Sequence, residues 1–279
     1  YVMECWFESG CASFAQWHYP FENQDKFDGA FPVDYICEAV DQTRGWFYSL
    51  MAVSTTVFDS ICYRRCLSLG HILDKDGKKM SKSRGNVVNP WDHFNKEGSD
   101  SIRWYMMTQS APWSPTNFDS NGVRESYAKM FLTLWNVHRF HADYAALDGF
   151  DADDADGFVA VADRSPLDRW ILSRLHTVAN SYHDHFVDWD FHKAGRELEA
   201  FVVNDLSNWY VRRSRRRLWD EADSLDKRAC QHTLHEVLLT VCRLIAPVAP
   251  FMPDQIHRDL TGVSVHLADW PVGSSLVES

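Results

Sequence analysis

The segment from Lys78 to Asn86 concentrates positive charge and hydroxyl groups and reads KKMSKSRGN. Lysine ammonium groups neutralise phosphate charge as movable point charges, while serine hydroxyls and loop amides can bond phosphate oxygens. Nucleotidyl transfer depends on such positioning and charge stabilisation. The spaced glycines of a Walker loop are absent. The segment therefore predicts phosphate chemistry, and the alternative interpretation is a solvated basic turn.

A second polar group follows an apolar run from Val33 to Glu38, which suits a buried strand. Glu38 ends this run, and Asp41 and Gln42 come directly after it. Ligands of parallel α/β sheets bind at the carboxyl ends of the strands. These three side chains are therefore candidates for a ligand site.

A third group is a run of arginines within six positions: Arg212, Arg213, Arg215, Arg216 and Arg217. The net charge of the chain is −11, which argues against a general nucleic-acid coat and makes a local basic cluster stand out. Guanidinium groups bind phosphate well. The run favours RNA contact; an exposed face paired with acidic neighbours is the alternative. Successive helical positions rotate by about 100°, so the five cannot share one stripe.

The elements that must position these groups are of two kinds. A strand over 33–38, a helix over 45–58 and a strand over 65–73 predict parallel pairing with a crossover. The turn Asp74–Gly77 closes the second strand, with glycine where positive φ costs little. The first part of the chain is therefore expected to be α/β.

Helices are expected afterwards. Asn89-Pro90 and Ser165-Pro166 each read as an N-cap followed by proline at the first helical position. Further helices are expected from Ser99 to Met107 and from about Val123 to Leu147. Apolar residues recur at three- and four-residue spacing beyond Ser165, which predicts an antiparallel bundle.

An aspartate-rich linker precedes that bundle, with Asp148, Asp151, Asp153, Asp154 and Asp156. Its spacing does not match a calcium loop, so a solvated loop is expected.

The composition suits a packed globular protein, with 45% hydrophobic and 24% charged residues. No apolar run approaches the roughly 20 residues that span a bilayer. The seven cysteines are odd in number and scattered, which fits a reducing cytoplasm better than a disulfide framework. Cys62 and Cys66 form the nearest pair, but no second pair follows at zinc-site spacing, so we expect no metal site.

The string Lys79-Met80-Ser81-Lys82-Ser83 resembles the KMSKS signature of class I aminoacyl-tRNA synthetases. The resemblance implies that this loop closes on ATP and stabilises departing pyrophosphate while the amino acid carboxylate attacks the α-phosphate. It assigns ATP binding to all five residues and a catalytic role to Lys79 and Lys82. ATP is expected to act as a substrate together with Mg²⁺.

Two upstream segments resemble the isoleucyl-tRNA synthetases of that family. Residues 38–48, EAVDQTRGWFY, match E-G-x-D-Q-x-R-G-W-F with Ala39 in place of glycine. The likeness implies that Glu38 holds the aminoacyl-adenylate and that Asp41 and Gln42 contact its ribose. Residues 6–10, WFESG, are similar to W-F-D-S-G with Glu8 in place of aspartate. By the same likeness, Trp6 and Trp46 wall the isoleucine side chain.

The resemblance continues to the end of the chain. Residues 99–105 and 111–113 look like the stem-contact region, and residues 167–174, 205–213 and 265–271 look like the anticodon-binding domain. The expected fold is the second half of a Rossmann-like catalytic domain followed by that helical domain. The expected boundaries are 1–122 for the catalytic half, 123–164 for a connecting helix and acidic linker, and 165–279 for the anticodon-binding domain.

The implied activity is ligation of isoleucine to tRNA(Ile) at the expense of ATP, in the cytoplasm. The family's H-x-G-H motif and its editing domain do not occur in these 279 residues. The chain is therefore expected to be a fragment that is inactive alone. Two alternatives stay open: a module that binds tRNA or nucleotide without catalysis, and a relative of the valine enzymes.

Overall fold

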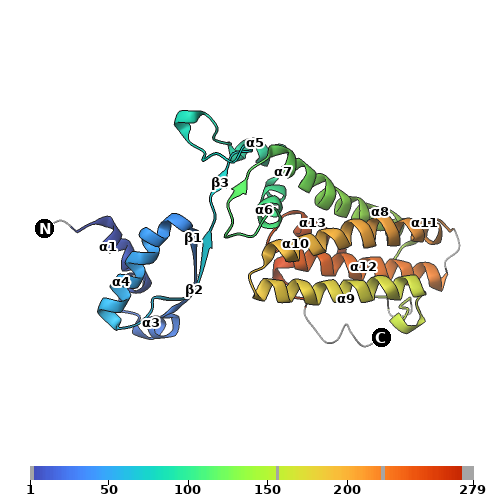
Figure 1. The fold of residues 1–279 in the computed structure, drawn as a ribbon. Helices are drawn as coiled ribbons and strands as arrows, with labels where there is room; N and C mark the ends of the chain where they lie inside the picture. Colours follow the sequence, from blue (N-terminus) through green and yellow to red (C-terminus); the bar gives the residue numbers. More distant parts are fainter. Residues whose placement is uncertain (1–2, 155–156, 221–223, 272–279) are drawn as a thin grey trace. The chain divides into compact units, whose positions relative to one another are not determined.

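The computed structural model describes residues 3–154, 157–220 and 224–271. The chain divides into two compact units (Figure 1). The first, called here the α/β unit, contains Tyr1–Val87 and Pro112–Phe118. The second, the helical unit, contains Val88–Ala111 and Asp119–Ser279.

The α/β unit is built from short helices around a pair of strands. In chain order its elements are α1 (Cys5–Gly10), α2 (Ala12–Ala15), α3 (Gln24–Ala30), β1 (Val33–Ala39), the 3₁₀ helix η1 (Val40–Arg44), α4 (Trp46–Phe58), β2 (Tyr63–Leu69), β3 (Ile72–Leu73), the 3₁₀ helix η2 (Lys82–Arg84) and β4 (Thr116–Asn117).

The predicted strand–helix–strand crossover is confirmed. β1 pairs with β2 in parallel, from Val33 opposite Tyr63 to Ala39 opposite Leu69, and α4 connects them. Ile36 on β1 packs with Phe47 and Leu50 on α4 in a small buried core. The crossover therefore brings the end of β1 and the start of α4 together.

The single strand expected over 65–73 is instead two strands. β2 ends at Leu69, and β3 covers only Ile72–Leu73, where it pairs in parallel with β4. At the break, the Gly70 amide donates to Pro112 O at 2.9 Å. A Cβ on Gly70 would lie 2.2 Å from Ser114 O, so only glycine allows this close approach of two backbones.

The helical unit contains α5 (Pro90–Phe94), α6 (Ser99–Thr108), α7 (Ser120–Ser126), the π-helix η3 (Tyr127–Leu132), α8 (Thr133–Asp148), the 3₁₀ helix η4 (Val161–Asp163), α9 (Pro166–Val187), α10 (Phe191–Ala200), the π-helix η5 (Phe201–Val211), α11 (Arg212–Trp219), α12 (Leu225–Ile245), α13 (Met252–Thr261) and the 3₁₀ helix η6 (Val265–Leu267). In Figure 1, α8, α9, α10 and α12 lie side by side.

Both predicted helix caps are confirmed. The Asn89 side chain accepts from the amide of Trp91, and the Ser165 hydroxyl accepts from the amide of Asp168. α12 is the most deeply embedded helix and packs against α8, α9, α11 and α13. One continuous core of buried apolar side chains extends through these helices, so their faces are fixed by packing.

The helix expected from about Val123 to Leu147 begins at Ser120 and contains a π-helical segment at Tyr127–Leu132. A second π-helix, η5, lies between α10 and α11 without a break in the chain. π-helical turns are rare and often accompany functional sites. η5 therefore draws attention to the residues that immediately follow it.

Candidate functional site

The loop that carries Lys79 and Lys82 begins at a turn held by Asp74. Asp74 Oδ1 accepts from the amides of Asp76 at 3.0 Å and Lys78 at 2.8 Å. Gly77 takes a φ of 76°, as expected for glycine in this turn. The turn therefore sends the following residues back beside β3, where Leu73 and Lys79 form an antiparallel bridge.

One side chain, Asn86, closes this loop at its far end. Asn86 Nδ2 donates to Asp74 Oδ2 at 2.7 Å, and the Ser81 amide donates to Asn86 Oδ1 at 2.9 Å. The hydrogen bond from Asn86, followed by the amide of Lys78, lowers the pKa of Asp74 from its ordinary value. Asp74 and Asn86 therefore clasp the two ends of the loop.

The sequence predicted the turn that begins at Asp74, but it did not predict the hydrogen bond between Asp74 and Asn86. The available signal was their residue type, since short Asp and Asn side chains readily bond nearby backbone amides. Only the folded loop shows which backbone amides donate to these two side chains.

The predicted ATP-binding residues lie on the clasped loop with their cations in solvent. Lys79, Lys82 and Ser83 are exposed, while Met80 and Ser81 are half-buried. Ser81 Oγ and Ser83 Oγ are 3.2 Å apart. Lys78 and Arg84 are also exposed, so the loop presents four cationic side chains together with hydroxyl groups. Such a surface can neutralise a polyphosphate.

Glu38, Asp41 and Gln42 lie at the carboxyl end of β1 as predicted. Glu38 is the residue before the last of β1, opposite Ser68, while Asp41 and Gln42 belong to η1. Gln42 Oε1 accepts from the amide of Trp46 at 2.9 Å and so caps the start of α4. This part of Gln42 is occupied by a structural contact, and Gln42 Nε2 donates to Asp41 Oδ2 at 3.5 Å. The Glu38 side chain has no hydrogen bond or ion pair among the described residues.

The substitution at Ala39 costs no backbone strain. Ala39 has φ −68° and ψ 156°, an extended conformation open to any L-residue. Close approach is instead required at Gly45, where a Cβ would lie 2.6 Å from Gln42 Oε1 and 3.2 Å from Trp6 Cη2.

The two predicted pocket tryptophans are brought near each other. The Trp6 ring lies against Gly45, the neighbour of Trp46 in the chain. The Trp46 indole donates to Ser9 O at 3.1 Å and so ties α4 to α1. Trp46 and Glu38 line one cavity of about 510 Å³, together with Tyr35, Ile36 and Leu50. Trp6 is not among the residues that line it, and its side chain is 41% exposed.

The described residues show no hydrogen bond or ion pair between the lysine loop and Glu38, Asp41 or Gln42. The two predicted parts of the nucleotide site are therefore both present in the α/β unit but not joined by direct contact.

Four of the five clustered arginines face solvent. Arg212, Arg213, Arg215 and Arg216 are exposed on α11, while the neighbouring Ser214 and Leu218 are buried. None of these four forms an ion pair with a carboxylate within the described residues. The outer face of α11 is therefore a strip of uncompensated guanidinium groups.

Arg217 does not fit the predicted phosphate contact. Its guanidinium bonds Asp168 through two nitrogens, at 2.8 and 2.7 Å, and Asp226 through Nε at 2.8 Å. Its side chain is only 15% exposed. Its donors are used inside the fold, because a helix carrying arginines at successive positions must turn one of them inward.

Asp168 is fully buried at the centre of this arrangement. It accepts hydrogen bonds from Arg217, from the Tyr210 hydroxyl and from the Ser165 hydroxyl. Burial raises the pKa of Asp168, but the bonds from Arg217 and Tyr210 outweigh burial and hold it below its ordinary value. The ionised pair fixes the start of α9 against α11.

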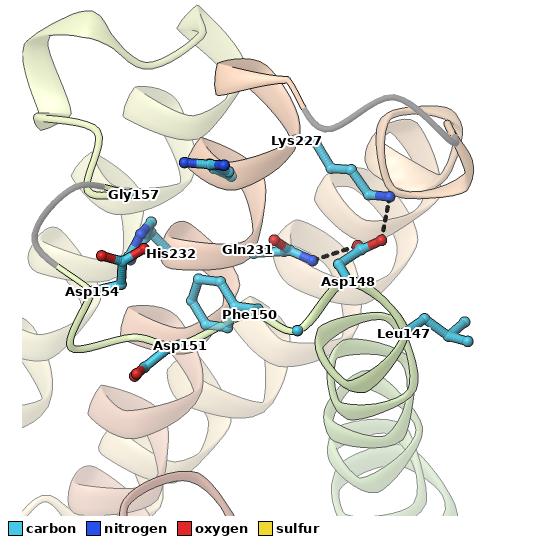
Figure 2. Close-up of a pocket in the computed structure, with 11 residues that line it drawn as sticks. Leu147, Asp148, Phe150, Asp151, Asp154, Gly157, Lys227, Gln231 and His232 are labelled. Carbon is cyan, nitrogen blue, oxygen red and sulfur yellow. Dashed lines mark hydrogen bonds and ion pairs between the residues drawn. The ribbon is translucent and has the colours of Figure 1, made fainter.

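The aspartate-rich linker is partly held by the fold rather than fully solvated. Asp148 accepts from Lys227 Nζ at 2.6 Å and from Gln231 Nε2 at 2.7 Å (Figure 2). These groups line a polar pocket of about 320 Å³ with Asp151, Asp154 and His232. Asp156 lies outside the described residues.

The part of the chain that the structure describes contains no group of three or more metal-ligating side chains. All seven cysteines are free; Cys62 is buried and Cys66 exposed. No helix in the described ranges is both long and apolar enough to cross a membrane.

Comparison with known proteins agrees with this geometry. The family model for tRNA synthetases class I (I, L, M and V) matches residues 1–119, and that for the anticodon-binding domain of tRNA ligase matches residues 168–279. Among solved structures, a LeuRS–tRNA–LeuAMS complex of Agrobacterium radiobacter superposes with a TM-score of 0.78 at 17% identity, covering 100% of this chain and 34% of that one. Methionyl-tRNA synthetase of Mycobacterium tuberculosis with methionyl-adenylate gives a TM-score of 0.71 at 18% identity, covering 87% and 47%.

The chain belongs to the class I aminoacyl-tRNA synthetase family. Among its sequence relatives, isoleucine--tRNA ligase of Clostridium novyi is 47% identical over 277 residues, 97% of this chain and 26% of the relative. Isoleucine--tRNA ligase 2 of Bacillus cereus is 47% identical over 271 residues, with the same coverage of each. The chain thus spans about a quarter of the length of these curated relatives.

Proposed function

We propose that this chain is the part of an isoleucine--tRNA ligase that carries the ATP-binding loop and the tRNA-binding helices. The whole enzyme would activate L-isoleucine with ATP and transfer it to tRNA(Ile) in cytoplasmic translation. The observation that carries this proposal is the exposed, clasped loop with Lys79 and Lys82, set in a chain 47% identical to isoleucine--tRNA ligases.

In the activation step, Lys79 and Lys82 stabilise the negative charge that collects on pyrophosphate as the α-phosphate bond breaks. Met80, Ser81 and Ser83 complete the ATP contact through the loop backbone and hydroxyls. Preorganised charge of this kind acts mainly in the transition state. The solvent exposure of both lysines supports this role, because their ammonium groups are not committed elsewhere.

The adenylate product is proposed to bind at the end of β1. Glu38 and Asp41 offer carboxylate oxygens to amino and hydroxyl groups, while the Gln42 amide donates to Asp41 through Nε2 at 3.5 Å and caps α4 through its oxygen. Trp46 supplies a flat wall beside Glu38 in the cavity, which suits a branched aliphatic side chain. Trp6 would join that wall through its contact at Gly45.

Magnesium enters this proposal as part of the substrate. Mg²⁺ binds through few protein carboxylates and mostly through water and substrate phosphates in nucleotide sites.

The helical unit is proposed to bind tRNA(Ile) as an antiparallel bundle, with residues 165–279 as the anticodon-binding domain. Residues 1–122 form the catalytic part and 123–164 the connection. Arg212, Arg213, Arg215 and Arg216 would contact phosphates, and Arg217 would anchor their helix. Because phosphate contacts position RNA without reading bases, these arginines should bind all tRNAs similarly.

A second candidate is a module that binds tRNA without catalysis. The specific observation in its favour is that the exposed arginines of α11 belong to the helical unit, which contains none of the predicted catalytic residues. For the valine alternative, the names of the relatives favour isoleucine instead.

The test uses two measurements on this chain. Binding of a labelled tRNA(Ile) transcript should be measurable by fluorescence anisotropy and should weaken steeply as salt rises. ATP–pyrophosphate exchange with isoleucine should stay at background for this chain alone, but appear in a protein of the relatives' full length that contains it. No tRNA binding at low salt, or no exchange by the long protein, would refute the proposal.

A further inference from the structure

An aromatic ring lies within the basic strip of the helical unit. Trp209, in the last turn of η5, is 46% exposed, whereas its neighbours Tyr210 and Val211 are buried. The Arg213 guanidinium carbon lies 3.8 Å from the centre of the Trp209 ring. A large apolar ring left in solvent among exposed cations has no evident role in folding.

The ring is held in a fixed orientation. Trp170 on α9 contacts it edge-to-face, with ring centroids 6.5 Å apart and an interplanar angle of 61°. One helical turn before Trp209, Asp205 accepts from Nε and Nη2 of Arg174 on α9, at 3.2 and 3.1 Å. η5 is thus tied to α9 on the side of the ring, which gives a preorganised aromatic surface.

Cationic groups lie on the same outer face of the helix. Arg212, Arg213 and Arg216 are three, four and seven residues after Trp209, the spacing that brings side chains to one helix face. The distance along the axis from Trp209 to Arg216 is about 10 Å. The buried residues Tyr210, Ser214 and Leu218 occupy the opposite face.

We infer that Trp209 is a stacking platform for an unpaired RNA base, with Arg213 on the ring and Arg212 and Arg216 on the flanking phosphates. Aromatic rings between basic side chains bind single-stranded nucleic acid because every base has a π-face. A duplex hides those faces, so the occupant is a loop or an unpaired strand. The inference rests on the proposed tRNA binding of the helical unit and adds the residue that takes a base.

Charge decides between RNA and an apolar protein partner. The four exposed arginines of α11 have no carboxylate partner within the described residues, and an apolar partner would leave them uncompensated. RNA supplies both a base for the ring and phosphates for the guanidinium groups.

The experiment combines a change in the ring with a change in the base. The probe is a labelled anticodon stem–loop RNA of tRNA(Ile), made with its natural loop and with abasic loop nucleotides. Wild-type chain and Trp209→Ala are titrated with both by anisotropy. Loss of stacking should weaken binding of the natural loop roughly 5- to 150-fold, the equivalent of about 1–3 kcal/mol. On the abasic loop the two proteins should bind alike.

The salt dependence separates stacking from charge. Trp209→Ala removes no charge, so the log–log salt slope should stay as in wild type. Arg216→Gln should instead lower the slope by roughly 0.7 to 0.9. Trp91→Ala is the matched control, because Trp91 is 67% exposed on α5 and outside the basic strip; it should bind like wild type. Trp209→Phe should recover most of the affinity, and circular dichroism melts confirm that all variants fold.

The outcomes distinguish failure of the stacking platform from failure of the proposed tRNA binding. Equal binding of the natural loop by wild type and Trp209→Ala overturns the stacking platform and leaves the tRNA proposal standing. An equal loss on natural and abasic loops also overturns it, because the ring would then not touch a base. Failure of wild-type chain to bind either RNA overturns both the platform and the tRNA-binding proposal.

Discussion

Lys82 and Arg216 carry the same positive charge, but the segments that hold them are anchored differently. Lys82 lies on a loop whose ends meet through Asp74 and Asn86, side chains that are only half-buried. Arg216 lies on a helix anchored by the fully buried Asp168 through Arg217. A segment with few buried contacts opens at small free-energy cost, whereas one tied to a buried ion pair does not. The difference suits the proposed roles, in which the loop closes on a nucleotide and the helix offers RNA a fixed surface.

The largest expected effect concerns the buried anchor. Asp168→Ala should destabilise the helical unit by about 3–5 kcal/mol, because it leaves the Arg217 charge without its buried partner. Asp226→Ala is the control: Asp226 bonds the same guanidinium but is 55% exposed, so its loss should cost less than about 1 kcal/mol. Urea unfolding measures both, and equal costs would show that burial does not distinguish the two carboxylates.

On the loop side, Lys82→Ala should slow isoleucine-dependent ATP–pyrophosphate exchange by about 10²-fold or more in a full-length enzyme. The KM for isoleucine should barely change, because the lysine acts on charge that develops in the transition state. Lys75→Ala, an exposed lysine in the preceding turn, serves as the control and should exchange normally. A normal rate for Lys82→Ala would make the loop a solvated basic turn.

Acid pH should weaken the helical unit selectively. Burial, followed by the nearby His235, lowers the pKa of His141 to about 3. The unfolded chain, with an ordinary histidine pKa near 6.5, then binds a proton that the folded state refuses. The stability is fully present above about pH 6.5 and is lost as pH falls toward 3, by roughly 2 kcal/mol at pH 5.

Hydrogen exchange at pH 7.5 and 5.0, corrected for intrinsic rates, reports this loss locally. In the α/β unit His18 and His71 are exposed, so its protection should change less. His141→Leu should flatten the pH dependence of the helical unit. An unchanged slope in that variant would show that another group controls it.

The smallest expected effect concerns the clasp. Asn86→Ala removes the bonds to Ser81 and Asp74 and should slow exchange about tenfold in a full-length enzyme, the equivalent of about 1.4 kcal/mol. Asn89→Ala removes a helix cap three residues later and should leave exchange intact while lowering the melting temperature slightly. If both variants behave alike, the clasp does not position the loop.

Local features were predictable because neighbouring residues encode them. Ser165-Pro166 predicted the start of α9, and the Asp74–Gly77 turn predicted the end of the strands, since caps and turns depend on residues a few positions apart. The apolar pattern likewise predicted the crossover from β1 through α4 to β2. The K-M-S-K-S string marked the loop by composition alone.

Contacts between distant segments were decided only by the tertiary structure. Five arginines look equivalent in the sequence, yet Arg217 alone meets Asp168, which is 49 positions away. Gly70 breaks the expected strand because residues 112–115 approach it, and Trp209 becomes a candidate platform because α9 supports its ring. The sequence by itself determined which residues could bind phosphate or a base. Packing decided which of them remain free to do so, because a guanidinium paired through two nitrogens with a buried carboxylate is turned into the fold and away from a ligand.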